Sequence, residues 1–243
     1  QDRALYFDIE SHSADELWDL PPEQFLRLGQ YAWGPHGEVH LTTDREEMLY
    51  QIRQADVVIG HNIHAFDLTA LFGKDSTEPL EMARDGRVFD TFVYAILAFP
   101  APYRFQDRKG HVHYVDGPGK IKQWLSLDNL SYQLDLEGKI GDLKAMAKQY
   151  GGFCHIPVDD PDFRAYARQD VVALQELTHE LIAMKPIDDY DWREQQFAGV
   201  CAQISRNGFK VDLDKATARR DELENRKQEL LSTLVEEYDF PAT

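Results

Sequence analysis

Two carboxylates stand two residues apart in the first apolar segment of the chain, LYFDIESHSADELW, which runs from Leu5 to Trp18. Successive side chains of a β-strand point to opposite faces, so Asp8 and Glu10 would project side by side from one face. The neighbouring apolar residues would then occupy the other face. A strand end that emerges into solvent explains an isolated D-x-E pair. A metal site explains it if further acids lie nearby in the fold.

A third carboxylate lies within the apolar face of a predicted helix at 161–184. Apolar side chains recur there every three or four residues, and Asp170 falls in the same stripe, with Tyr166 one turn earlier. A carboxylate in an apolar stripe is costly to desolvate, so it should face a cation, a hydrogen-bond donor or water. The alternative is a stripe that reaches the surface near Asp170.

A fourth acid follows a predicted buried strand in the segment VVIGHNIHAFDLTAL. Asp67 comes directly after Phe66 and five residues after Asn62. Asp67 could also be a first-turn helix acid that complements the helix dipole, and Asn62 could be a cap. Asp90 precedes Thr91 and an apolar helical run, so we expect it to be an N-cap and leave it out of the site.

The ordered set of these segments resembles a known family. FDIE, NIHAFD and YARQD match the order and spacing of the three exonuclease motifs of the DEDD superfamily, D-x-E, N-x(2 or 3)-[FY]-D and Y-x(3)-D. The histidine version of the third motif would place His where this chain has Ala165. The chain therefore resembles the tyrosine subfamily, which includes the proofreading domains of family A DNA polymerases and the ribonuclease D group.

The segment after the predicted long helix favours the polymerases. EQQFAGVCAQISRNGFKVDLDKATARRDELENRKQELL resembles the start of a family A polymerase thumb, with a helix, an RNG-x-x-x-D turn and a long helix. The residues in the second and third motifs, HN-x-x-x-FD and QDVV, are more similar to the bacteriophage-type branch of these polymerases than to the bacterial repair polymerase branch. The resemblance implies a 3′-5′ exonuclease that removes nucleoside 5′-monophosphates from a single-stranded or frayed DNA 3′ end, attached to the remainder of a polymerase. It leaves any processivity factor open.

The resemblance also implies the roles of seven residues. Catalysis would depend on Asp8, Glu10, Asp67, Tyr166 and Asp170, and substrate binding on Asn62 and Phe66. The four acids would hold two divalent cations, Mg²⁺ or Mn²⁺, since these prefer all-oxygen ligands. Asp8 would bridge both ions, Glu10 and Asp170 would complete the nucleophile-side site, and Asp67 would support the second ion through water. Tyr166 would orient the attacking water.

Two rival functions remain open at this point. One is a 3′-5′ exonuclease of the same superfamily that acts on RNA. The other is a catalytically inactive exonuclease domain kept as a structural support for a polymerase; such domains have lost acids, whereas all four are present here. Comparing DNA and RNA oligomers of one sequence would separate the first rival from the proofreading function.

Composition limits the class of protein. The 243 residues carry a formal net charge of −17, so the chain lacks the overall basic character that alone signals nucleic-acid binding. Cys154 and Cys201 lie far apart, which indicates neither a zinc knuckle nor a disulfide framework. No segment has the about 18 consecutive apolar residues of a membrane span. We expect a cytoplasmic fragment of a longer protein, since the chain begins at Gln1.

The elements that must position the acids predict an α/β class. The resemblance implies a ribonuclease H-like 3′-5′ exonuclease fold, a mixed sheet flanked by helices, over residues 1–186, and the helical N-terminal part of a polymerase thumb over 187–243. A hairpin should turn at GPHG, and residues 99–122 should form a long loop or an exposed hairpin. That segment is the most basic one, and we expect four of its side chains to guide the DNA strand: Arg104, Arg108, Lys109 and Lys120.

Overall fold

The computed structural model describes residues 3–138 and 143–238; residues 1–2, 139–142 and 239–243 of the two predicted domains lie outside the described residues. The strands are β1 (Ala4–Ser11), β2 (Leu26–Trp33), β3 (His40–Thr42), β4 (Val57–Gly60), β5 (Val88–Asp90), β6 (Arg104–Gln106) and β7 (Val112–Tyr114). The α-helices are α1 (Pro22–Phe25), α2 (Arg45–Gln54), α3 (Asp67–Phe72), α4 (Glu78–Arg84), α5 (Thr91–Ala98), α6 (Pro118–Trp124), α7 (Leu127–Gln133), α8 (Leu143–Tyr150), α9 (Pro161–Met184), α10 (Asp189–Asn207) and α11 (Leu213–Tyr238). Short 3-10 helices are η1 (Ala14–Trp18) and η2 (Phe153–His155).

Five strands form one mixed sheet in the order β3-β2-β1-β4-β5. The first three strands pair antiparallel as a meander, and β4 and β5 continue the sheet in parallel with β1. Parallel neighbours need crossover connections, and α2 and α3–α4 supply them. The predicted α/β class, with a mixed sheet flanked by helices, is confirmed.

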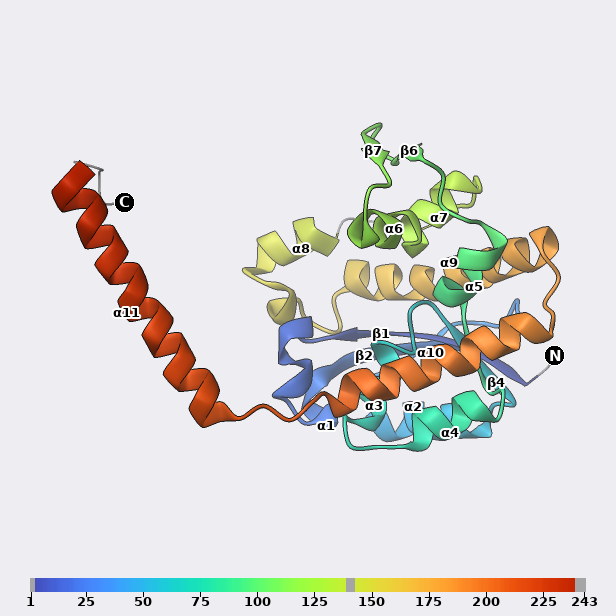
Figure 1. The fold of residues 1–243 in the computed structure, drawn as a ribbon. Coiled ribbons are helices and arrows are strands. Elements are labelled where there is room, and N and C mark those ends of the chain that lie inside the picture. Colours follow the sequence, from blue (N-terminus) through green and yellow to red (C-terminus); the bar gives the residue numbers. More distant parts are fainter. Residues whose placement is uncertain (1–2, 139–142, 239–243) are drawn as a thin grey trace. The chain divides into compact units, whose positions relative to one another are not determined.

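Helices cover both faces of the sheet (Figure 1). On one face Leu5, Phe7 and Ile9 of β1 pack with residues of α2, α3 and α4. On the other face Ala4 and Tyr6 belong to a second core that contains residues of α5, α7 and α9. The alternation predicted for β1 is therefore confirmed. It directs Asp8 and Glu10, which share the face of Tyr6, toward α9.

Several helix starts follow the expected capping chemistry. Asp90 accepts a hydrogen bond from the backbone N–H of Phe92 at the start of α5, as predicted for an N-cap. Asp160 accepts from two backbone N–H groups at the start of α9, which places that helix at the predicted residues. In the 99–122 segment, the predicted exposed hairpin is present as β6 and β7. The chain then enters α6, because Pro118 suits the first turn of a helix and Trp124, just after the segment, is buried.

The chain divides into two compact units between Asn207 and Gly208, rather than between 186 and 187 as expected. The difference is α10, which packs on α4 and α5 of the first unit. The buried side-chain amide of Gln195 accepts from the backbone N–H of Asp90 (2.9 Å) and donates to its carbonyl (3.0 Å). A Cβ added to Gly199 would lie 2.5 Å from the Cβ of Ala83, so α10 approaches α4 closely. These contacts tie α10 to the edge of the sheet.

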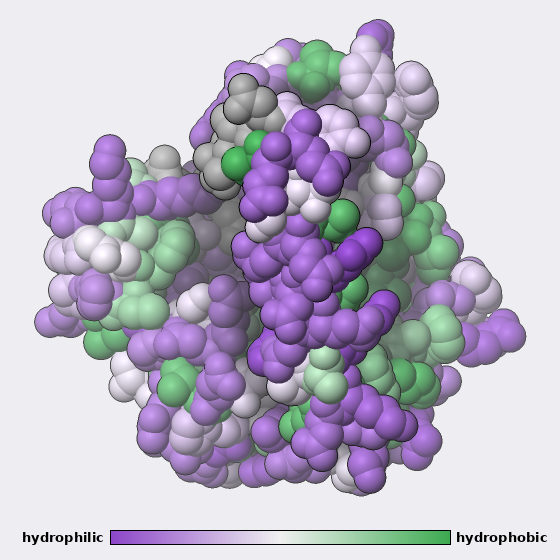
Figure 2. All heavy atoms as spheres, turned by 60° about the vertical axis from the view of Figure 1, so that its left-hand side comes forward, coloured by the Kyte–Doolittle hydropathy of each residue, from purple (hydrophilic) through white to green (hydrophobic). Residues whose placement is uncertain are grey.

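The second unit consists mainly of α11. Asp212 accepts from the backbone N–H of Lys215 at the start of this helix. All described side chains of α11 are exposed. No helix in the described ranges is both long and apolar enough to span a membrane. Hydrophilic side chains predominate on the surface seen in Figure 2, and hydrophobic ones form small separate groups, in keeping with the net charge of −17.

Candidate metal centre

Three of the four predicted metal ligands lie together. One carboxylate oxygen each of Asp8, Glu10 and Asp170 falls within 4.8 Å of the others. β1 supplies two of them at alternate positions of one face, and α9 packs across this strand and supplies the third. Asp170 is 2% exposed, whereas Asp8 and Glu10 are half-buried. The apolar stripe of α9 is therefore buried at Asp170 and does not reach the surface there. Asp170 faces the other two acids.

A glutamine on the neighbouring strand orients Asp8. Gln30 lies opposite Asp8 in the β1–β2 register, and its Nε2 donates to Asp8 Oδ2 at 2.7 Å. The Gln30 side chain is fully buried. Sequence reasoning missed this residue. The available signal was an amide in the otherwise largely apolar segment LRLGQYAW, just before the predicted hairpin turn at GPHG.

Asp67 lies close to Asp8 but is not part of the three-carboxylate group among the described residues. It occupies the first residue of α3 and is 4% exposed. Burial raises the pKa of Asp67 well above its ordinary value, and the negative charges of Asp8 and Asp90 raise the pKa further; hydrogen bonds from the backbone of Asp67 itself and of Ile9 oppose the rise. Asp67 therefore lies near Asp8 without joining the three carboxylates. The prediction that it supports an ion through water is compatible with this position.

The loop before Asp67 is held by Asp90. Asn62 adopts a left-handed backbone conformation (φ 66°), which is uncommon for a non-glycine residue and better tolerated by Asn than by most residues. Asp90 Oδ1 accepts from the backbone N–H of Asn62 (2.7 Å), and Oδ2 accepts from that of His64 (3.1 Å). His61 and Thr91 add a contact at 2.9 Å. Asp90 thus caps α5, as predicted, and also fixes the Asn62 loop, which the sequence did not reveal.

The remaining predicted residues flank the acids on both sides. Tyr166 lies one helical turn before Asp170 on α9 and is half-buried. Phe66 packs edge-on against Phe25, with ring centroids 6.0 Å apart, and lines a cavity of about 340 Å³ together with Glu10. Asn62 lines a cavity of about 390 Å³ together with Asp8. The two predicted substrate-binding residues therefore border separate hollows, one beside each carboxylate of β1.

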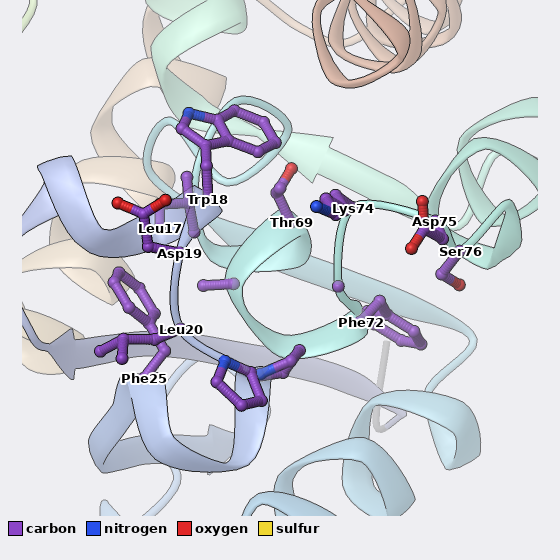
Figure 3. Close-up of a pocket in the computed structure, with 14 residues that line it drawn as sticks. Leu17, Trp18, Asp19, Leu20, Phe25, Thr69, Phe72, Lys74, Asp75 and Ser76 are labelled. Carbon is purple, nitrogen blue, oxygen red and sulfur yellow. The ribbon is translucent and has the colours of Figure 1, made fainter.

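A further cavity of about 400 Å³ has no connection with this chemistry (Figure 3). It is lined by the segment from η1 to α1 and by α3 and the loop after it, with Trp18, Thr69 and Lys74 among its side chains. None of the four predicted ligand acids lines it. Its volume is close to the about 390 Å³ of the cavity beside Asp8 and Asn62, so cavity size does not distinguish the two.

A second group of possible metal ligands consists of His12, Glu16 and Cys154. Its geometry has a structural explanation. Glu16 Oε2 accepts from the backbone N–H of Ser13 in the capping box of η1 and lies 3.9 Å from the imidazole Nδ1 of His12. A helix cap and a neighbouring ion pair account for two members of this group.

The donors of the main group suit a particular class of ion. Three carboxylate oxygens gathered in one place repel one another unless a proton or cation lies between them. All-oxygen donor sets fit Mg²⁺ or Mn²⁺ rather than zinc. The buried Oε1 of Gln30 has no hydrogen-bond partner within residues 3–138 and 143–238, which marks a polar position next to Asp8 that water or a solvated ion can satisfy. The residues present therefore fit divalent cations.

Comparison with protein-family models finds no match, and no curated protein matches the sequence. Function is therefore inferred from the motifs and from the geometry of the side chains.

Proposed function

We propose that this chain is a divalent-cation-dependent 3′-5′ exonuclease of the DEDD superfamily, with a ribonuclease H-like fold, that proofreads DNA as part of a family A polymerase. The observation that carries the proposal is the gathering of Asp8, Glu10 and Asp170 within 4.8 Å. Motifs that are separated by about 160 residues in the sequence supply one cluster of oxygens, as the resemblance requires. A chance occurrence of the first and third motifs gives no reason for their carboxylates to meet.

The roles of the residues follow from their positions. Asp8, Glu10 and Asp170 would hold divalent cations directly, and Asp67 would act through water because it stands apart from this group. Bound cations would supply activation of water and stabilisation of the leaving 3′ oxygen. Tyr166, one helical turn before Asp170 on α9, would orient the attacking water. Gln30 is a positioning residue, since its amide holds the carboxylate of Asp8.

The substrate is an unpaired DNA 3′ end. The cavity that contains Asp8 and Asn62 is also lined by Phe92 and Lys122, which offer an aromatic ring and a positive charge to a terminal nucleotide. A paired terminus must first lose base stacking, which costs about 1 to 2 kcal/mol per step. Mismatched ends have already lost much of this energy. We therefore expect single-stranded and mismatched ends to be degraded faster than matched duplex ends, and no incorporation of nucleotides by this segment.

The experiment follows digestion of 5′-labelled single-stranded, mismatched and matched DNA, and of RNA with the same sequence, at fixed salt. Wild-type protein should release mononucleotides from DNA in Mg²⁺ or Mn²⁺ and none in EDTA. Asp8→Asn should lower the rate by orders of magnitude, whereas Glu180→Gln, a half-buried acid further along α9, should not. Faster digestion of RNA would favour the ribonuclease alternative, and an inactive wild type would favour the structural one.

A further inference from the structure

Two tyrosines stand exposed on the β6–β7 hairpin. The side chains of Tyr103 and Tyr114 are 79% and 51% exposed, and their rings meet edge-to-face with centroids 5.8 Å apart. The hairpin does not need them for anchoring. Phe105, the middle residue of β6, is buried, and its ring packs edge-on against that of Trp124 of α6, with centroids 5.2 Å apart. The tyrosine pair is therefore free of the core and presents π faces to solvent.

Positive charge accompanies the tyrosines. Residues 99–122 hold five basic residues and two acids, in a chain whose net charge is −17. Two of the four residues expected to guide DNA have structural partners instead: Arg108 pairs with Asp128 at 3.3 Å, and Lys120 contacts His113 at 3.1 Å. Arg104 next to Tyr103, Lys109 in the turn of the hairpin and Lys122 of α6 are exposed.

One of these cations connects the hairpin with the candidate metal centre. Lys122 of α6 lines the same cavity of about 390 Å³ as Asp8. The hairpin is tied to α6 through Phe105 and Trp124, and Trp124 belongs to the core that α9 shares. Figure 1 shows the hairpin and α6 on the α9 side of the sheet, and Asp170, which meets Asp8 and Glu10, is a residue of α9. A strand whose 3′ end occupies the cavity can therefore continue past Lys122 toward the tyrosines.

We propose that the β6–β7 hairpin is a platform for single-stranded DNA, on which Tyr103 and Tyr114 stack bases upstream of the 3′ terminus while Arg104, Lys109 and Lys122 contact phosphates. The proposal rests on the proposed exonuclease function for the direction of the strand. Aromatic side chains beside basic ones are the usual combination for unpaired nucleic acid, because stacking tolerates any base and the cations follow the backbone. An otherwise acidic chain needs such a local attachment point.

The test separates binding from hydrolysis. Binding of a 5′-fluorescein 12-mer of deoxythymidine is measured by anisotropy in EDTA over a series of salt concentrations. The double variant Tyr103→Ala/Tyr114→Ala should weaken binding at least about fivefold, because each stacked base is worth roughly 1 to 3 kcal/mol. Arg104→Ala/Lys109→Ala should reduce the slope of log K against log salt by about 1.4, since each phosphate contact contributes about 0.7 for single strands. Tyr103→Phe/Tyr114→Phe should bind like the wild type.

Control variants lie on the opposite face of the sheet. Tyr50→Ala on α2 removes a tyrosine that is 60% exposed, and Arg84→Ala removes an exposed arginine at the end of α4; neither should change binding.

Hydrolysis of a thymidine dinucleotide in Mn²⁺, too short to reach the hairpin, should be the same in the hairpin variants and the wild type. Wild-type binding by both alanine variants would overturn the platform. Absence of hydrolysis of any substrate would instead overturn the exonuclease function, and the binding measurement would still decide the platform.

Discussion

Replacing Asp170 by Asn should stabilise the metal-free protein while it destroys metal binding. The substitution keeps the shape of the side chain and removes one of three negative charges whose oxygens lie within 4.8 Å of one another. At an effective dielectric constant of about 20, two unit charges at that distance repel by about 3.5 kcal/mol. Proton uptake and water relax part of this repulsion. We therefore expect the free energy of unfolding in EDTA to rise by about 1 to 3 kcal/mol.

The assay is thermal unfolding of the full chain with EDTA and with a series of Mn²⁺ concentrations. For a unit of this size, 1 kcal/mol corresponds to about 2 to 4 °C in Tm. Wild-type Tm should increase with Mn²⁺ because the ion binds only the folded state. Asp170→Asn should start from a higher Tm and respond weakly to the ion.

Glu180→Gln is the matched control, because it neutralises another partly buried acid of α9 that lies outside the three-carboxylate group. It should shift neither the Tm in EDTA nor the response to Mn²⁺. An Asp170→Asn variant that is less stable than the wild type in EDTA and keeps the full response to Mn²⁺ would refute the reasoning.

Four other changes test separate parts of the account. Tyr166→Phe removes one hydroxyl and should slow single-turnover DNA hydrolysis by about 100-fold or less, well short of the loss caused by Asp8→Asn. Gln30→Leu removes the donor to Asp8 and should weaken Mn²⁺ binding by about 10- to 100-fold in a calorimetric titration. Gly199→Val should lower the free energy of unfolding by about 1 to 3 kcal/mol in urea titrations, because its side chain would collide with α4. Burial raises the pKa of Asp67, so the neutral carboxyl contributes stability that is complete below the unfolded pKa of about 4 and is lost as pH rises through the folded pKa. Asp67→Asn should therefore flatten the decline of metal-free stability above about pH 4, measured by urea unfolding at a series of pH values.

Local patterns predicted the elements that carry the acids. Alternation in LYFDIE gave the face of Asp8 and Glu10, and the helical stripe gave the side of α9 on which Asp170 lies. Both patterns arise because one face of the strand or helix is buried. Burial of one face determines the spacing of apolar residues within a single segment, so the segment alone was enough for the prediction. The cap at Asp90 was equally predictable, since a carboxylate before a helix satisfies free N–H groups.

Contacts between distant segments were not predictable from these patterns. The hydrogen bond from Gln30 to Asp8 depends on the register of β1 and β2. A shift of one residue would turn Gln30 to the other face of the sheet and remove the hydrogen bond. The division of the chain after Asn207 depends on Gln195 reaching the backbone of Asp90, 105 residues earlier. Lys120 was expected to guide DNA, and that role stays a prediction; the contact of its amine with His113 of β7 was not predictable from the local sequence.

The most direct test of the central claim is anomalous diffraction from crystals of the protein soaked in Mn²⁺. The account predicts two manganese peaks, with oxygens of Asp8, Glu10 and Asp170 as ligands and Asp67 joined to one of the ions through water. Crystals of Asp170→Asn grown and soaked in the same way should lose at least the ion that Asp170 contacts. Manganese found only at the His12, Glu16 and Cys154 group, or no manganese near Asp8 at a concentration that supports DNA hydrolysis, would contradict the account.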